Sequence, residues 1–285
     1  MLSQVTIDRV VGAALEEDAP WGDLTSETLI PADATARADL VAREPGVFSG
    51  GEVFTAAFRL TDPRINVQIV VDDGAPFAAG AVLAVVTGPA RSVLTAERVG
   101  LNFAQRMSGI ATVTARFVAE VAHTSCRIAD TRKTTPGLRA FERKAVRDGG
   151  GRNHRYSLSD AVMAKDNHLA VLARTGASVT EALLAAKAAL PHTTHIEVEV
   201  DRLDQIEPVL TAGIGTIMLD NFSLDDLRAG VAQVAGRATV EASGGVSLET
   251  VRAIAETGVD VISVGTLTHS ARALDLGLDV QIDTR

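Results

Sequence analysis

The stretch RIADTRKTTPGLRAFERKAVRDGGGRNHRYSLSDAVMAKDNH, residues 127–168, joins the start of a strand-helix pattern to a concentration of positive charge. It holds ten arginine and lysine residues against five aspartate and glutamate residues. The difference, ten minus five, is a local charge of +5 in a chain whose net charge is −9. Such a local reversal of sign favours a binding site for a small polyanion.

Four of these cations follow apolar or extended-looking runs, at points where strands are expected to end: Arg132, Lys133, Arg155 and Lys165. The alternative interpretation is a solvated, charged helix face. It suits the cations of the amphipathic run LRAFERKAVRD (residues 138–148), which lie at helical spacing. It does not suit the four at strand ends, and we expect these to face a ligand.

Composition limits the classes of protein to consider. The 285 residues are 46% hydrophobic and 4% aromatic, which suits one large α/β domain, or a barrel with a smaller domain. No stretch approaches the roughly 20 apolar residues of a membrane span. The amphipathic N-terminal segment carries acids, unlike a signal peptide. The single cysteine, Cys126, is interpreted as a packing residue and fits a reducing cytoplasm. We expect a cytoplasmic protein without nucleic-acid or membrane partners.

The first 112 residues are predicted to form an α+β unit. Apolar spacing predicts a helix over residues 5–16, and GDLTS (Gly22–Ser26) predicts a turn followed by polar caps. Short alternating runs between residues 34 and 86, separated by glycine and proline, predict an antiparallel sheet, with VFTAAFRL as a helix laid on it. Residues 94–121 predict a long connector helix, with Gly109 as a candidate break.

Strands and helices alternate from residue 113 to residue 271. Strands are predicted at 127–131, 161–165, 195–200, 215–219, 238–242 and 260–264, and helices at 136–148, 178–190, 202–211, 223–235 and 247–257. Parallel strands with alternating helices form either a doubly wound sheet or a barrel. The barrel is favoured because functional groups follow all six strands, and only a barrel gathers all these ends at one mouth.

The strand ends suggest what this mouth binds. Turns at Ser243-Gly244-Gly245 and at Gly265 precede expected helix starts and offer backbone N–H groups to a phosphate. Glu199 and Asp220 place carboxylates at the ends of two apolar strands, where they suit sugar hydroxyls, hydrated Mg²⁺ or a developing positive charge. The alternative for these two is a structural ion pair with a neighbouring arginine. At the end of the second predicted strand, Asp166 directly follows Lys165. A phosphoribosyl diphosphate with an anionic co-substrate fits the whole set of strand ends.

The motifs LTAERVGLN, SGIAT, DTRKTTPGLR, GGGRNHR, KDNH, EVEVD, LDN, EASGG and VGTLTHS occur in this order. Together they resemble the quinolinate phosphoribosyltransferases, also called nicotinate-nucleotide pyrophosphorylases (carboxylating). The resemblance runs from GDLTS nearly to the C-terminus. It implies conversion of quinolinate and phosphoribosyl diphosphate to nicotinate mononucleotide, CO₂ and pyrophosphate, with Mg²⁺, in NAD biosynthesis. It also implies an α/β fold: an incomplete α/β barrel at 113–271 with an N-terminal α+β open sandwich domain, on which residues 272–285 pack back.

The resemblance further implies roles for individual residues. The quinolinate site would be lined by Thr131, Arg132, His154, Arg155 and Lys165. Lys133 would contact a diphosphate or carboxylate, and Lys133 and Lys165 would join Glu199 and Asp220 as catalytic residues. Glu199 and Asp220 would hold the ribose hydroxyls and the metal, the latter directly or through water. The 5′-phosphate would lie at Ser243, Gly244, Gly245, Gly265 and His269. Homodimers are implied, in which Arg98 of one subunit completes the partner's site.

Three small departures from the family pattern lie beside the site: TTPGLR, HRYSLSD and MAKDNH. They change packing and leave charge alone. Two other functions stay open. One is an aldolase in which Lys165 forms a Schiff base. The other is a catalytically silent anion-binding or transport-accessory protein on the same fold.

Overall fold

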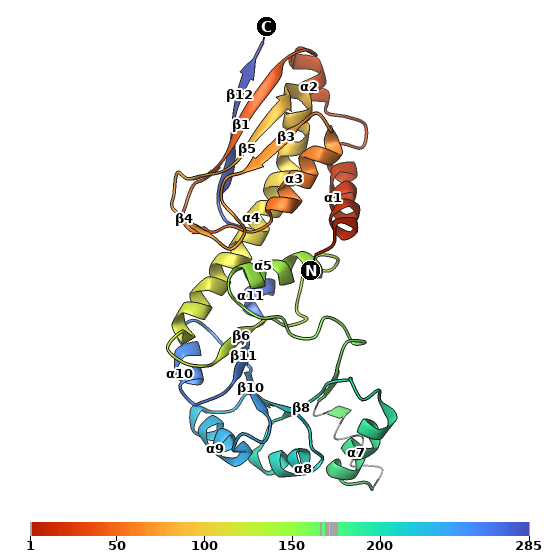
Figure 1. The fold of residues 1–285 in the computed structure, drawn as a ribbon, viewed down its shortest axis with the longest axis vertical. Coiled ribbons are helices and arrows are strands. Elements are labelled where there is room, and N and C mark those ends of the chain that lie inside the picture. The colour runs from red at the N-terminus through yellow and green to blue at the C-terminus, as the bar shows by residue number, and fades with distance from the viewer. Residues whose placement is uncertain (1, 166, 169–170, 172–175, 285) are drawn as a thin grey trace. The chain divides into compact units, whose positions relative to one another are not determined.

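The computed structural model describes the chain except residues 1, 166, 169–170, 172–175 and 285 (Figure 1). It consists of two compact units. Unit 1 comprises Met1–Ala115, Thr134–Gly150 and Leu267–Arg285, and unit 2 comprises Arg116–Lys133 and Gly151–Thr266. The sequence-based division differs in three places, because residues 113–115, 134–150 and 267–271 group with unit 1. Each unit is described by itself.

Unit 1 is built on an antiparallel sheet with the strand order β12-β1-β5-β3 (Figure 1). These strands are β1 (Thr35–Ala42), β3 (Asn66–Ile69), β5 (Val82–Pro89) and β12 (Leu276–Asp283). Two short strands, β2 (Gly46–Val47) and β4 (Pro76–Phe77), pair separately. Strand β12 pairs with β1 along its whole length, with Thr35 opposite Asp283 and Ala42 opposite Leu276. The C-terminal segment therefore completes the sheet of unit 1.

The helices of unit 1 are α1 (Gln4–Asp18), α2 (Leu24–Leu29), α3 (Gly51–Thr61), the first part of α4 (Ala90–Val121) and α5 (Arg139–Asp148). Helix α3 and the first part of α4 pack on the apolar face of the sheet, and α1 packs against α3. Phe54 and Phe58 of α3, whose ring centroids are 4.8 Å apart, pack with Leu40 and Leu83 of the sheet in a buried core. Period-2 burial along β1 supplies the matching face, since every second residue is buried.

Two local expectations for unit 1 were wrong. Residues 24–29 form helix α2 where only a turn with caps was expected, because the Asp23 carboxylate accepts hydrogen bonds from the N–H groups of Thr25 and Ser26 and so caps a helix start. Helix α4 is continuous through Gly109, so no break occurs there. It runs from unit 1 into unit 2 and serves as the predicted connector.

Unit 2 contains a six-stranded parallel sheet with the order β6-β11-β10-β9-β8-β7. The strands are β6 (Arg127–Ala129), β7 (Val162–Ala164), β8 (Ile196–Val200), β9 (Thr216–Asp220), β10 (Thr239–Ser243) and β11 (Val261–Ser263). Among the described residues, the edge strands β6 and β7 do not pair with each other, so the barrel is incomplete. The predicted fold class, an incomplete α/β barrel with an N-terminal α+β domain, is confirmed.

Helices alternate with these strands. They are α7 (Val179–Ala189), α8 (Ile206–Thr211) with the short 3₁₀ turn η1 (Leu203–Gln205) before it, α9 (Leu224–Val234) and α10 (Val251–Ala255), and the four-residue α11 (Thr266–His269) follows β11. Helix α9 begins after the capping residue Ser223 and buries Leu227, Gly230 and Val234, three to four residues apart.

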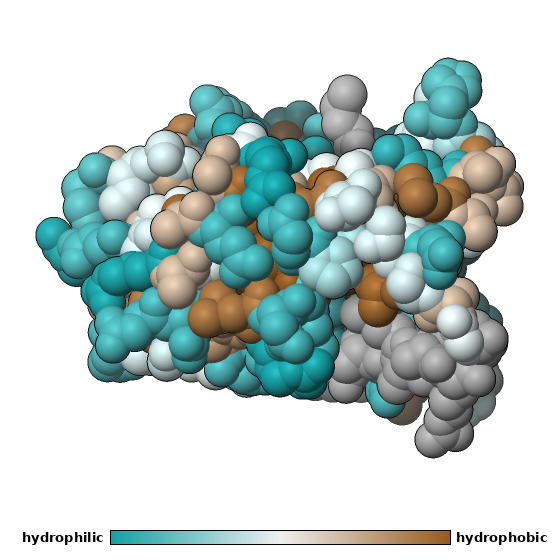
Figure 2. Space-filling model, turned by 90° about the horizontal axis from the view of Figure 1, so that it is seen from below, coloured by the Kyte–Doolittle hydropathy of each residue, from teal (hydrophilic) through white to brown (hydrophobic). Residues whose placement is uncertain are grey.

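On the surface that is seen from below in the view of Figure 1, hydrophobic residues form small groups between hydrophilic ones (Figure 2).

Two further features bear on the earlier expectations. Cys126 is buried, and burial raises the pKa of its thiol to about 11, which agrees with a packing role. Within the described part of the chain, none of the helices combines the length and the apolar character of a membrane span.

Candidate active site

A cavity of about 430 Å³ lies around the C-terminal ends of the strands of unit 2. Its walls include nine residues that the sequence predicted for the site: Thr131, Arg132, Lys133, His154, Arg155, Lys165, Glu199, Asp220 and Ser243. Met163, Met218 and Ser263 complete the lining. Parallel strands bring residues that are more than 100 positions apart in the sequence to one mouth.

The other predicted site residues lie outside this lining. Gly244 and Gly245 directly follow Ser243, and Gly265 comes two residues after the end of β11. Arg98, which is exposed on α4, and the exposed His269 belong to unit 1. The structure therefore does not assign these two to the cavity. Asp166 lies outside the described residues.

The cavity carries concentrated positive charge. The Arg155 side chain donates from Nη1 to the carbonyl of Ala161 at 2.8 Å, which fixes the guanidinium at the wall. Burial, and then the charge of Arg132, lowers the pKa of Arg155. Two guanidinium groups that repel each other at a partly buried wall are stabilised when a carboxylate or phosphate binds between them. The geometry suits a dianionic ligand.

The two predicted carboxylates have different surroundings. Glu199 accepts a hydrogen bond from Lys165 Nζ at 2.6 Å, so its ion pair is with a lysine of the cavity instead of the arginine considered from the sequence. Asp220 ends the neighbouring strand β9 and accepts from the Asn221 side chain at 2.6 Å. Both carboxylates line the cavity together with its cations. These two carboxylates are the negatively charged groups in a lining whose other charged residues are cations.

The loops after β9 and β10 interlock beside Ser243. Asn221 has a φ of 59° and donates its N–H to the carbonyl of Ser243 at 2.9 Å. Gly244 has a φ of 100°, and a Cβ there would lie 2.2 Å from Asn221 Oδ1. Only glycine fits this turn. Helix α10 begins at Val251, not at Ser247 as predicted, so any anion bound here would meet the glycine turn rather than a helix start.

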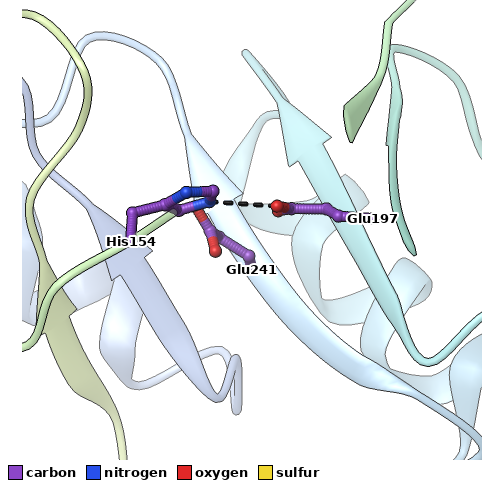
Figure 3. A group of neighbouring side chains, drawn as sticks. All are labelled: His154, Glu197 and Glu241. Atoms are coloured by element: carbon purple, nitrogen blue, oxygen red, sulfur yellow. Dashed lines mark ion pairs between the residues drawn. The ribbon is translucent and has the colours of Figure 1, made fainter. Parts of the chain in front are cut away.

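His154, Glu197 and Glu241 form a group just inside the barrel (Figure 3). His154 Nε2 lies 3.0 Å from Glu197 Oε2 and 3.6 Å from Glu241 Oε1. Both carboxylates are buried, on strands β8 and β10, which are separated by β9. Inward residues of alternate strands form one layer of such a barrel, and this brings the two glutamates together.

Burial and the charge of Glu197 raise the pKa of Glu241 to about 7. For His154, burial favours the neutral ring, but the two carboxylates outweigh it and raise its pKa. The donor atoms of the three residues lie within 4.8 Å of one another, close enough to be considered for a metal ion. In this arrangement the proton on Nε2 is directed at Glu197, so the lone pair that a metal would need is not offered.

Sequence reasoning missed Met163, Met218 and Ser263 of the wall, and also Glu197 and Glu241 beneath it. The two glutamates left a signal. In IEVEV (residues 196–200) charged and apolar residues alternate, which places Glu197 on the same face as Glu199. A buried glutamate whose side chain points into the barrel needs a partner there, and His154 is that partner of Glu197.

The protein-family model "Quinolinate phosphoribosyl transferase, C-terminal domain" matches residues 110–279, and the model of the N-terminal domain of the same family matches residues 23–108. The chain belongs to this family. The resemblance seen in the sequence motifs is thereby confirmed.

Relatives in the quinolinate phosphoribosyl transferase family match along nearly the whole chain. The probable nicotinate-nucleotide pyrophosphorylase [carboxylating] of Bacillus subtilis is 39% identical over 281 residues, covering 99% of this chain and 96% of the relative. The nicotinate-nucleotide pyrophosphorylase [carboxylating] of Mycobacterium leprae is 43% identical over 291 residues, covering 98% and 100%. The crystal structure of NadC from Streptococcus pyogenes superposes with a TM-score of 0.95 at 39% identity, covering 100% and 99%.

Proposed function

We propose that this protein is an enzyme of NAD biosynthesis that transfers the phosphoribosyl group of 5-phosphoribosyl 1-diphosphate to quinolinate. The products are nicotinate mononucleotide, CO₂ and pyrophosphate. The observation that carries the proposal is the cavity of unit 2, which Arg132, Arg155 and Lys165 line together with Glu199 and Asp220. The names of the relatives agree with this chemistry.

Quinolinate is a dianion, and it binds at the cationic wall. Arg132 and Arg155 hold its two carboxylates, since a guanidinium pairs with a carboxylate through two parallel hydrogen bonds. Thr131 and His154 line the same wall. Lys133 is exposed at the mouth and contacts the diphosphate or a carboxylate. The ribose lies toward Glu199 and Asp220, and the 5′-phosphate at the turn of Ser243, Gly244 and Gly245, with Gly265 and His269.

The reaction exchanges one bond at the anomeric carbon. The pyridine nitrogen forms a bond to this carbon while the bond to the diphosphate oxygen breaks, and the carbon gains positive character in between. Glu199 and Asp220 stabilise this charge from fixed positions. The bond from the ring to the 2-carboxylate then breaks, and its electron pair is taken up by the cationic pyridinium. CO₂ leaves, and a proton from solvent replaces it on the ring.

Mg²⁺ fits the oxygen-rich side of the cavity. Asp220 ends β9, and Glu199 is the residue before the last of the neighbouring strand β8. Oxygen ligands such as these carboxylates are those that Mg²⁺ prefers, often with several waters retained. Because Glu199 is already paired with Lys165, binding through water is the arrangement that leaves this ion pair intact. The ion neutralises the charge of the diphosphate when bound.

The active unit in this proposal is a cytoplasmic homodimer whose sites are shared. Arg98 is exposed on α4. As in the family pattern, it reaches the partner's cavity and adds a further cation for quinolinate. The proposed partners are otherwise small molecules, without nucleic acid or membrane.

A diphosphate-release assay with quinolinate, nicotinate and nicotinamide in parallel tests the proposal. We expect the fastest release with quinolinate, accompanied by an equal amount of CO₂. Lack of turnover with quinolinate would favour the anion-binding alternative. Borohydride treatment with substrate tests the aldolase alternative. We expect no trapped adduct, because the Lys165 amine is held by the Glu199 carboxylate at 2.6 Å.

A further inference from the structure

Two buried acids, Asp130 and Glu197, hold the segment around Arg155 in the cavity wall. The Asp130 carboxylate accepts hydrogen bonds from the backbone N–H of His154 at 2.7 Å and from Asn153 Nδ2 at 2.6 Å. The Glu197 carboxylate contacts the ring of His154, with Oε2 3.0 Å from Nε2. Asp130 and Glu197 are 0% and 4% exposed, so neither can be replaced by water without opening the barrel interior.

The His154 ring links Glu197 to Arg155. Its Nδ1 accepts a hydrogen bond from the backbone N–H of Arg155 at 2.7 Å, and only an unprotonated ring nitrogen can accept. The ring proton therefore lies on Nε2, directed at Glu197 (Figure 3). Both nitrogens are used in this way, so His154 has no ring donor left for a ligand and presents its ring to the cavity.

Glu241 does not share this task. Its nearer oxygen is 3.6 Å from His154 Nε2, too far for a hydrogen bond. Glu197 and Glu241 are nevertheless matched in burial, each 4% exposed, and in position inside the barrel. Substitutions at the two sites thus remove the same kind of buried carboxyl group, and only one of them removes the fastening of His154.

We propose that Glu197 is a positioning residue for substrate recognition: it fixes the Nε2–H tautomer of His154, whose Nδ1 fixes the backbone amide of Arg155 and with it the guanidinium that receives a carboxylate. The inference rests on the proposed function for the identity of that carboxylate. The hydrogen-bonded series Glu197–His154–Arg155 affects the binding energy of quinolinate equally in the ground state and in the transition state. It therefore controls KM.

The first test compares Glu197→Met and Glu197→Gln in steady-state kinetics. Methionine keeps the volume and leaves the Nε2–H unpaired, so we expect KM for quinolinate to rise about tenfold or more with kcat changed less than about threefold. Glutamine retains an acceptor oxygen and should restore KM to within about threefold of wild type. KM for phosphoribosyl diphosphate should not change in either variant.

Glu241→Met is the matched control, because it removes an equally buried carboxyl group that does not hold His154. We expect KM for quinolinate within about threefold of wild type there. Thermal melting of all three variants separates the loss of fastening from loss of folding. Equal rises of KM in Glu197→Met and Glu241→Met, or equal rises in Glu197→Met and Glu197→Gln, would overturn the proposal.

The second test reads the tautomer directly and does not depend on activity. Nitrogen NMR of protein labelled at its six histidines, with His154→Gln to assign the signal, should show His154 protonated at Nε2 and unprotonated at Nδ1 at a pH above the raised pKa of the ring. The opposite tautomer would overturn the proposal even if the enzyme is fully active. If the protein does not turn over quinolinate but shows the expected tautomer, the proposed function is wrong and the positioning of His154 by Glu197 is still supported.

Discussion

At the scale of single residues, the cavity of unit 2 is set up for two negative charges on one ligand. Arg132, Arg155 and Lys165 line it, and burial, followed by the charge of Arg132, lowers the pKa of Arg155. Nicotinate carries one carboxylate and would leave a partly buried cation unpaired, at a cost of about 1–3 kcal/mol. We therefore predict kcat/KM for quinolinate at least about tenfold above that for nicotinate. Comparable values for the two would show that the wall recognises a single carboxylate.

Asp220 is predicted to act on the reacting carbon more than on quinolinate. It ends β9 and lines the cavity together with Glu199 on the neighbouring strand β8. Asp220→Ala should reduce kcat by about 100-fold or more while KM for quinolinate changes little, because stabilisation of the transition state is lost. Equal losses in kcat and in quinolinate affinity would place Asp220 at the pyridine instead.

Glu241 gives the stability of the protein a pH dependence. Burial, and then the charge of Glu197, raises its pKa to about 7, above the roughly 4.3 of an unfolded chain. Between these values the folded state binds more protons than the unfolded state, so the free energy of unfolding falls as pH rises through the window. Glu241→Gln cannot ionise. Its stability relative to wild type should increase by about 1–3 kcal/mol between pH ~4.5 and ~8, measured by urea unfolding.

At the scale of elements, Gly109 in the middle of α4 is a point of close approach. A Cβ there would lie 2.0 Å from the carbonyl oxygen of Arg272, whose segment passes directly over the helix. Gly109→Ala should therefore lower the free energy of unfolding by about 1–3 kcal/mol, despite the better helix propensity of alanine. Gly12→Ala in α1 is the control, since nothing lies within 4 Å of the added Cβ. We expect it to stabilise by about 0.5–1 kcal/mol.

The elements also show what the sequence could and could not predict. All six barrel strands were found because apolar runs ended at charged or glycine-rich turns, a pattern that local reasoning can detect. Helix α2 was missed because six residues with one capping aspartate leave too weak a periodic signal. Glu197 and Glu241 were missed as a pair because their meeting depends on the shear of the barrel, which no single strand reveals. The grouping of residues 134–150 with unit 1 is likewise a tertiary property.

At the scale of the whole molecule, the proposal of shared sites is tested by complementation. Arg98→Ala and Lys165→Ala should each be inactive alone. When they are mixed under conditions that exchange subunits, half of the dimers carry one chain of each kind. Each mixed dimer regains one of its two sites, so activity should recover to about a quarter of wild type.

Subunit exchange has to be confirmed by mass labelling in the same sample. If exchange is complete and activity does not return, Arg98 serves its own subunit's site or none. A mixture of Lys165→Ala with Asp220→Ala is the control. Both residues belong to one cavity, so no mixed dimer contains an intact site and activity should stay at the background level.

The pairing of β12 with β1 has a consequence for synthesis on the ribosome. The edge of β1 that receives residues 276–283 is translated some 240 residues earlier, as the distance from Thr35 to Leu276 shows. While the barrel strands emerge, that edge has no strand beside it and presents unpaired backbone groups. The four-stranded sheet of unit 1 can therefore close only after every strand of unit 2 has been translated. Unit 1 is begun before unit 2 and is completed after it.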